Sequence, residues 1–138
     1  MASPMNRYEK TLVLLLRLDG LIMLLALVPS MMPLAWMEAI HRSLGMGELS
    51  GEPLTGYLTR SLSALYAMHG AVLLFVASDV RRYLPLVKFL AAATIVFALG
   101  LTALDVIVGM PVFWIVAEGP SLLLLYCVVL WLTSRVEI

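Results

Sequence analysis

Three ionisable residues lie near the ends of long apolar stretches and could do chemistry inside a membrane. Arg60 precedes one stretch, Asp105 lies near the end of the next, and Glu118 lies near the start of the last. On helical geometry all three fall within about 10 Å of the same membrane boundary. An arginine beside two carboxylates predicts either a structural clasp joining three helices or a site that handles anions or protons. We favour the clasp, because pairing is the commonest way to make such charges tolerable.

A second polar group lies about halfway through the apolar stretches. Asp19 and His69, counted from opposite sides of the membrane, reach the same depth, and Tyr66 is about one turn from His69. A carboxylate that orients an imidazole could relay protons or leave one ring nitrogen free for a ligand. The alternative is a buried hydrogen-bonded pair, or His69 bonded to Tyr66 or to a carbonyl. We favour such a structural role.

The sequence predicts no catalytic residues, no metal ligands and no cofactor. With one cysteine in the chain, a multi-thiolate site is excluded. The second histidine, His41, falls in a polar loop, which argues against bis-histidine haem. Phosphate-binding loops, dinucleotide fingerprints, HExxH and GxSxG do not occur in the sequence. We therefore lean against an enzyme.

Four long apolar segments must position these residues. The chain has 138 residues, of which 62% are hydrophobic and 13% charged, against about 25% charged in a soluble domain. A spanning helix needs about 20 mostly apolar residues. Four candidate spans meet that length, at about 11–30, 61–78, 87–108 and 112–133. The sequence therefore predicts an all-α membrane protein, a single domain over 1–138 that forms a four-transmembrane-helix bundle.

Two of the spans carry a face of small and hydroxyl residues, which in lipid predicts close helix packing. The face of span 87–108 comprises Ala91, Thr94, Ala98, Thr102, Asp105 and Gly109, so Asp105 should point into the bundle. The face of span 61–78 comprises Ser63, Tyr66, Gly70 and Ala77. In the last span Pro120 removes an amide donor, and we expect a kink or a break there.

Basic residues gather at one end of the spans and predict the orientation. These residues are Arg7, Lys10, Arg81, Arg82, Lys88 and Arg135. Because cytoplasmic loops carry the excess of Lys and Arg, both termini should be cytoplasmic. The outer loop, 31–59, predicts a short helix from Pro33 to Leu44. That helix would either lie on the outer membrane surface or cap the outer mouth of the bundle.

Two stretches resemble a known family. Tyr57–Val87 (YLTRSLSALYAMHGAVLLFVASDVRRYLPLV) and Asp105–Pro120 (DVIVGMPVFWIVAEGP) are similar to a family of small, uncharacterised bacterial four-helix integral membrane proteins. The resemblance covers most of the chain. It implies a single domain in the bacterial cytoplasmic (inner) membrane, and it carries over no binding or catalytic residue.

Three functions fit these features. We rank first an accessory or structural subunit of a membrane assembly, or of a homo-oligomer. A small proton-coupled or solute transporter acting as an oligomer ranks second. A membrane enzyme or lipid-binding module with a pocket between its helices ranks third. The expected partners are the lipid bilayer and other protein chains, and the formal net charge of zero gives no case for nucleic acid.

Overall fold

The computed structural model describes residues 4–49 and 51–136, and the described chain is helical with no strand. Four helices are long and apolar enough to cross a membrane, over Arg7–Met31, Pro53–Val76, Leu84–Val108 and Val112–Thr133. The predicted number of spans and the all-α class are confirmed. The last two spans agree closely with the predicted bounds. Val112–Thr133 is identical to the predicted span 112–133, and Leu84–Val108 begins three residues before the predicted span 87–108.

The chain divides into two compact units. The terminal unit holds residues up to Leu16 together with those from Val76 onward, and the central unit holds Arg17–Phe75. The prediction of a single transmembrane domain stays a prediction.

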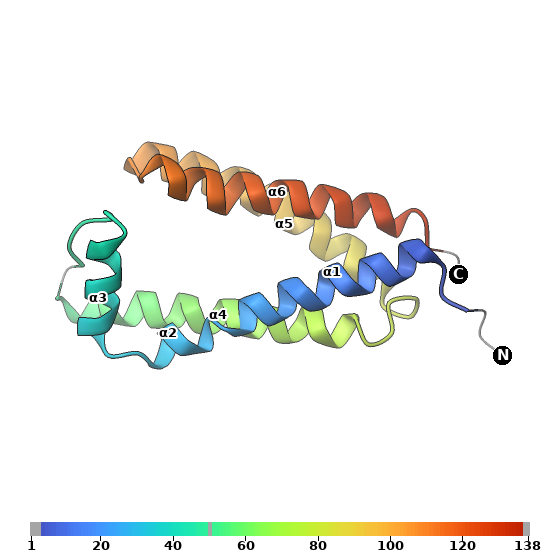
Figure 1. The fold of residues 1–138 in the computed structure, drawn as a ribbon, viewed down its shortest axis with the longest axis horizontal. Coiled ribbons are helices and arrows are strands. Elements are labelled where there is room, and N and C mark those ends of the chain that lie inside the picture. Colours follow the sequence, from blue (N-terminus) through green and yellow to red (C-terminus); the bar gives the residue numbers. More distant parts are fainter. Residues whose placement is uncertain (1–3, 50, 137–138) are drawn as a thin grey trace. The chain divides into compact units, whose positions relative to one another are not determined.

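The terminal unit is built on a helical hairpin. Helix α5 (Leu84–Val108) and helix α6 (Val112–Thr133) pack side by side, as Figure 1 shows in yellow and red. Gly109 ends α5 in the left-handed conformation, with φ 78°, which glycine adopts without a Cβ penalty. The buried residues of α5 include Ala91, Thr94, Ala98 and Asp105. The predicted small-residue face of this helix is therefore confirmed at these four positions, while Thr102 is half-buried and Gly109 is exposed.

Helix α6 runs unbroken through Pro120, so the break that we expected as one alternative is wrong. The Ser121 hydroxyl donates to the carbonyls of Ala117 and Glu118, a bond of the kind that often bends a helix. A Cβ built on Gly119 would overlap the Thr102 hydroxyl. The backbone of α6 thus lies directly against α5 beside the proline, and this packing holds the helix together.

The central unit contains the end of α1 (Arg7–Leu24) and three further helices, which are α2 (Leu27–Met31), α3 (Leu34–Ser43) and α4 (Pro53–Val76). The predicted continuous span 11–30 is interrupted at residues 25 and 26. Pro29 cannot donate to the Leu25 carbonyl and its ring clashes there. Instead, Val28 N–H donates to Leu25 O at 3.0 Å, a tighter three-residue turn.

Helix α4 begins eight residues before the predicted span 61–78 and ends two residues before its end. Pro53 starts it, because proline is favoured at the first helical position. Opposite the small-residue face of this span, Leu65, Met68 and Phe75 are exposed, and Val72 is half-buried. Helix α3 turns across the beginning of α4 (Figure 1), and Gly56 lies next to Leu34 at this contact.

Candidate functional site

The α5–α6 hairpin brings two carboxylic acids of the terminal unit together. The turn at Gly109 reverses the chain, and its N–H and that of Met110 both donate to the Asp105 carbonyl, at 3.1 and 2.9 Å. Asp105 thus sits at the last turn of α5, while Glu118 lies on the second turn of α6. Trp114, one turn before Glu118, hydrogen-bonds to the Glu118 side chain, and the two carboxyl groups are close enough to interact electrostatically.

Asp105 is the residue of this pair that has an unsatisfied buried oxygen among the described residues. The residue is 6% exposed, and its Oδ2 has no hydrogen-bond partner in the described part of the chain. Buried polar atoms nearly always have a partner, because an unmatched one costs free energy. Within residues 4–49 and 51–136, no third His, Cys, Asp or Glu joins the pair to make a metal-binding group of three. The pair is therefore suited to accept a proton or a hydrogen bond from a donor outside this unit.

Arg60, the predicted third member of this cluster, belongs to the central unit. Its side chain is exposed, and its Nη2 donates to the Met32 carbonyl at 3.2 Å. The structure thus brings Asp105 and Glu118 together within one unit. The three-residue clasp of Arg60, Asp105 and Glu118 stays a prediction.

The mid-membrane group lies beside a close crossing of α1 and α4 in the central unit. A Cβ built on Gly70 would lie 2.6 Å from the Gly20 carbonyl oxygen and 2.8 Å from the Leu24 nitrogen. Asp19 and His69 each precede one of these glycines, and with Tyr66 they are half-buried. Asp19 and His69 therefore lie next to the crossing, each on its own helix. A direct interaction of Asp19, His69 and Tyr66 stays a prediction.

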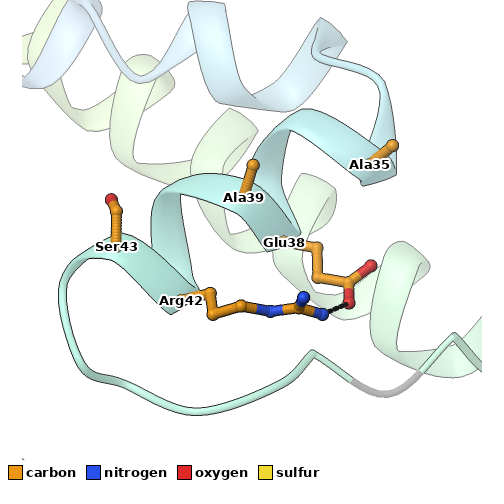
Figure 2. A pocket seen from close by; sticks show the side chains of 5 residues that line it. All are labelled: Ala35, Glu38, Ala39, Arg42 and Ser43. Atoms are coloured by element: carbon orange, nitrogen blue, oxygen red, sulfur yellow. Dashed lines mark hydrogen bonds and ion pairs between the residues drawn. The ribbon is translucent and has the colours of Figure 1, made fainter.

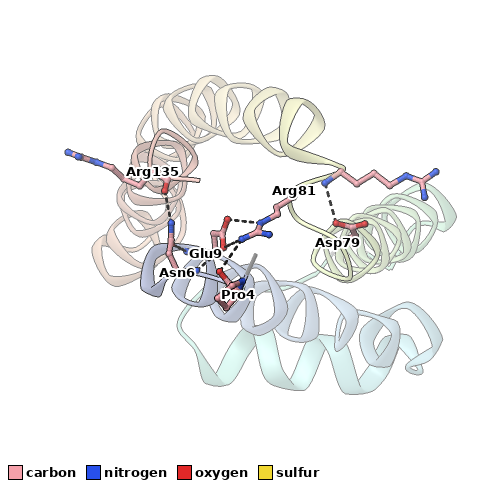
Figure 3. A network of polar contacts seen from close by, with 7 residues as sticks. Pro4, Asn6, Glu9, Asp79, Arg81 and Arg135 are labelled. Atoms are coloured by element: carbon pink, nitrogen blue, oxygen red, sulfur yellow. Dashed lines mark hydrogen bonds and ion pairs between the residues drawn. The ribbon is translucent and has the colours of Figure 1, made fainter. Parts of the chain in front are cut away.

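A buried ion pair in the terminal unit was not predicted. Glu9 is 0% exposed. Arg81, in the turn between α4 and α5, holds it with two hydrogen bonds, Nε to Oε1 at 2.8 Å and Nη2 to Oε2 at 2.9 Å. Arg81 Nη2 also donates to the Pro4 carbonyl at 3.3 Å. Figure 3 shows the guanidinium lying against the carboxylate. This two-pronged geometry is the strongest form of a charged hydrogen bond in proteins.

Asn6 completes the network. Its side-chain oxygen accepts from Glu9 N–H, and its own N–H donates to Glu9 Oε2, both at 2.9 Å. These reciprocal bonds form a capping box at the start of α1. The Asn6 side chain also donates to the Arg135 carbonyl at 3.1 Å (Figure 3). The network therefore ties the start of α1 to the α4–α5 turn and to the end of α6.

Half of this network has a signal in the sequence. Asn6 followed three residues later by Glu9, just before an apolar run, is a capping pattern. The pairing with Arg81 has no such signal, because the partners are 72 positions apart. Arg81 contributed to the prediction of orientation alone.

A hollow of about 490 Å³ on the surface of α3 holds a second ion pair. All five residues that line it, Ala35, Glu38, Ala39, Arg42 and Ser43, come from α3 itself (Figure 2). Arg42 pairs with Glu38 at 2.6 Å and with Glu48 at 3.5 Å. Because these charges are exposed to solvent, their pairing contributes little to stability.

Comparison of the chain with family models, with curated proteins and with solved structures finds no match. The similarity of Tyr57–Val87 and Asp105–Pro120 to a family of bacterial four-helix membrane proteins stays a prediction.

Proposed function

We propose that this integral membrane protein is an accessory or structural subunit of a membrane assembly, located in the bacterial inner membrane. The observation that carries the proposal is the unpartnered Asp105 Oδ2 beside Glu118. A carboxylate near a membrane boundary is stabilised by a donor or a cation. A neighbouring chain that places a Lys, Arg or hydroxyl against the α5–α6 hairpin supplies that partner.

The surface of the helices supports an assembly as well. In each of the four spans, 17–22% of the most apolar stretch is buried inside the chain. The other residues of these stretches are half-buried or exposed, and the exposed ones can contact lipid or other protein. Gly100 on α5 has open space where a Cβ would be, and such a small residue lets a partner helix approach closely.

In the proposed orientation both termini face the cytoplasm, and α3 lies at the outer membrane surface. Arg7, Arg82 and Arg135 belong to the ends of the spans at which basic residues gather. Because Lys and Arg are in excess on the cytoplasmic side, these ends face the cytoplasm in the proposed orientation. Trp36 of α3 is 65% exposed, and exposed tryptophan favours the headgroup region.

Native mass spectrometry of the protein, extracted gently from its host membrane, tests the proposal. We expect a reproducible heavier partner or a defined homo-oligomer. The Asp105→Asn and Glu118→Gln variants should lose this association. Glu48→Gln, the matched control, removes an exposed carboxylate that is 80% accessible and should retain it. A wild-type protein that is monomeric under every extraction condition would contradict the proposal.

The same carboxyl pair favours one alternative function, a proton-coupled transporter. Two neighbouring carboxyl groups can hold a single shared proton and pass it on. The protein reconstituted in sealed vesicles would then show a proton flux that Asp105→Asn and Glu118→Gln abolish and Glu48→Gln leaves intact. Flux by a purified monomer would favour transport over the subunit function.

A further inference from the structure

The terminal unit has a hollow of its own, at which positively charged side chains lie beside aromatic ones. It measures about 470 Å³ and is lined by Asn6, Arg7, Tyr8, Ser134, Arg135 and Val136. These residues come from the start of α1 and from the chain just after α6. The hollow therefore lies where two spans end, at the level of lipid headgroups if these helices cross a bilayer.

The two arginines of the hollow have no carboxylate partner in the described part of the chain. The ion pairs described there involve Arg42 and Arg81. Arg7 instead donates to the Tyr8 hydroxyl at 2.8 Å. The Arg135 side chain extends away from the Glu9–Arg81 pair, as Figure 3 shows. Two unpaired guanidinium groups on one hollow create a site for an anion.

Aromatic rings hold these arginines in place. The guanidinium of Arg7 lies 4.8 Å from the centre of the Tyr8 ring, and that of Arg135 lies 5.4 Å from the Trp131 ring. Tyr8 and Trp131 contact each other edge to face, with ring centres 5.9 Å apart. Tyrosine and tryptophan favour the membrane interface. Each guanidinium carries five N–H donors, so stacking on the rings and the bond from Arg7 to the Tyr8 hydroxyl leave further N–H groups able to bind an oxyanion.

We propose that this hollow binds the phosphate group of an anionic phospholipid, with Arg7 and Arg135 as its donors and the Ser134 hydroxyl beside them. Basic pockets at the ends of transmembrane helices bind such headgroups, and an Arg fork matches a phosphate in a two-pronged geometry. The acyl chains extend along the apolar surface of α6 next to Trp131. The inference is independent of the proposed function, because it requires no protein partner.

Lipid titration of the detergent-purified protein, followed by native mass spectrometry, tests this site. We expect one phosphatidylglycerol to be retained in preference to phosphatidylcholine with the same acyl chains. Arg7→Gln/Arg135→Gln should weaken that binding about thirtyfold, at the typical contribution of each basic residue near a membrane surface. Equal retention of the two lipids by the wild-type protein overturns the proposal without any variant.

Arg82→Gln/Lys88→Gln is the matched control. It removes two positive charges from the same unit, and Arg82 also lies over a tyrosine, 5.6 Å from the Tyr83 ring. This variant should retain the lipid. Equal weakening in both double variants would show unspecific attraction and overturn the proposal. Displacement of the lipid by an equal concentration of inorganic phosphate would assign the hollow to a soluble anion and overturn it too.

Discussion

Two buried acids of the terminal unit, Glu9 and Asp105, have opposite surroundings. Arg81 and the Asn6 N–H satisfy the oxygens of Glu9, whereas Asp105 Oδ2 has no partner in the described residues. Removing one partner of a matched buried pair strands the other, while removing an unmatched charge strands nothing. Substitutions at the two positions should therefore have different effects on stability.

Glu9→Gln should destabilise the protein by about 1.5–3 kcal/mol, because it removes charge-assisted hydrogen bonds. The cost stays within that range since the Arg81 side chain is 24% exposed and can reach water. Thermal unfolding in detergent measures the effect. Glu38→Gln, in the exposed pair with Arg42, should change stability by less than about 1 kcal/mol. If both substitutions lowered the free energy of unfolding equally, the buried Glu9–Arg81 pair would stabilise the protein no more than the exposed pair does.

Asp105→Asn should leave the melting temperature of the isolated protein unchanged or raise it. The substitution keeps the shape of the side chain and removes a charge whose Oδ2 has no described partner. Thermal unfolding of the variant against wild type checks this. A clear fall would support the clasp with Arg60 instead, because breaking a satisfied pair is costly.

At the scale of elements, two prolines inside apolar segments behave differently. The chain leaves the helix at residues 25 and 26, one turn before Pro29, whereas α6 continues through Pro120. Around Pro120 the Ser121 hydroxyl bonds to nearby carbonyls and Gly119 packs on α5. The outcome of a proline in a helix thus depends on the neighbouring helix, whose packing can hold the backbone together although one amide donor is missing.

The α1–α4 crossing should be sensitive to one methyl group. Gly70→Ala would place its Cβ 2.6 Å from the Gly20 carbonyl oxygen, and because the obstacle is backbone, the helices must separate. We expect a loss of about 1–3 kcal/mol, as is typical of overpacking. Thermal unfolding measures it. Gly100→Ala, where nothing lies within 4 Å of the added Cβ, should be neutral or stabilising, since alanine is the better helix former.

At the scale of the whole molecule, the proposed orientation can be tested with single cysteines in a Cys127→Ser background. Ser43→Cys on α3 should react with a membrane-impermeant maleimide in intact cells. Ser134→Cys after α6 should react once the cells are opened. Both serines are exposed in the structure, so accessibility depends on the side of the membrane. Labelling of Ser134→Cys in intact cells would contradict cytoplasmic termini.

The sequence by itself determined the number of spans, the helical class and the buried face of α5. These features are local, because the length of an apolar run and the repeat of small residues along one helix can be counted without knowing any partner. Asp105 was thereby placed correctly on a buried face, and Asn6 with Glu9 formed a readable capping pattern.

The tertiary structure alone decided which residues meet. The Glu9–Arg81 pair joins positions 72 residues apart, and the contact of Gly119 with Thr102 holds α6 together at a proline. The environment of a charged residue depends on its partner. The sequence around Asp105 is therefore compatible with a clasp, with a proton site or with a carboxyl group that has no partner in its own unit. Long-range packing chooses among them, because free energy depends on whether each buried polar group finds a match.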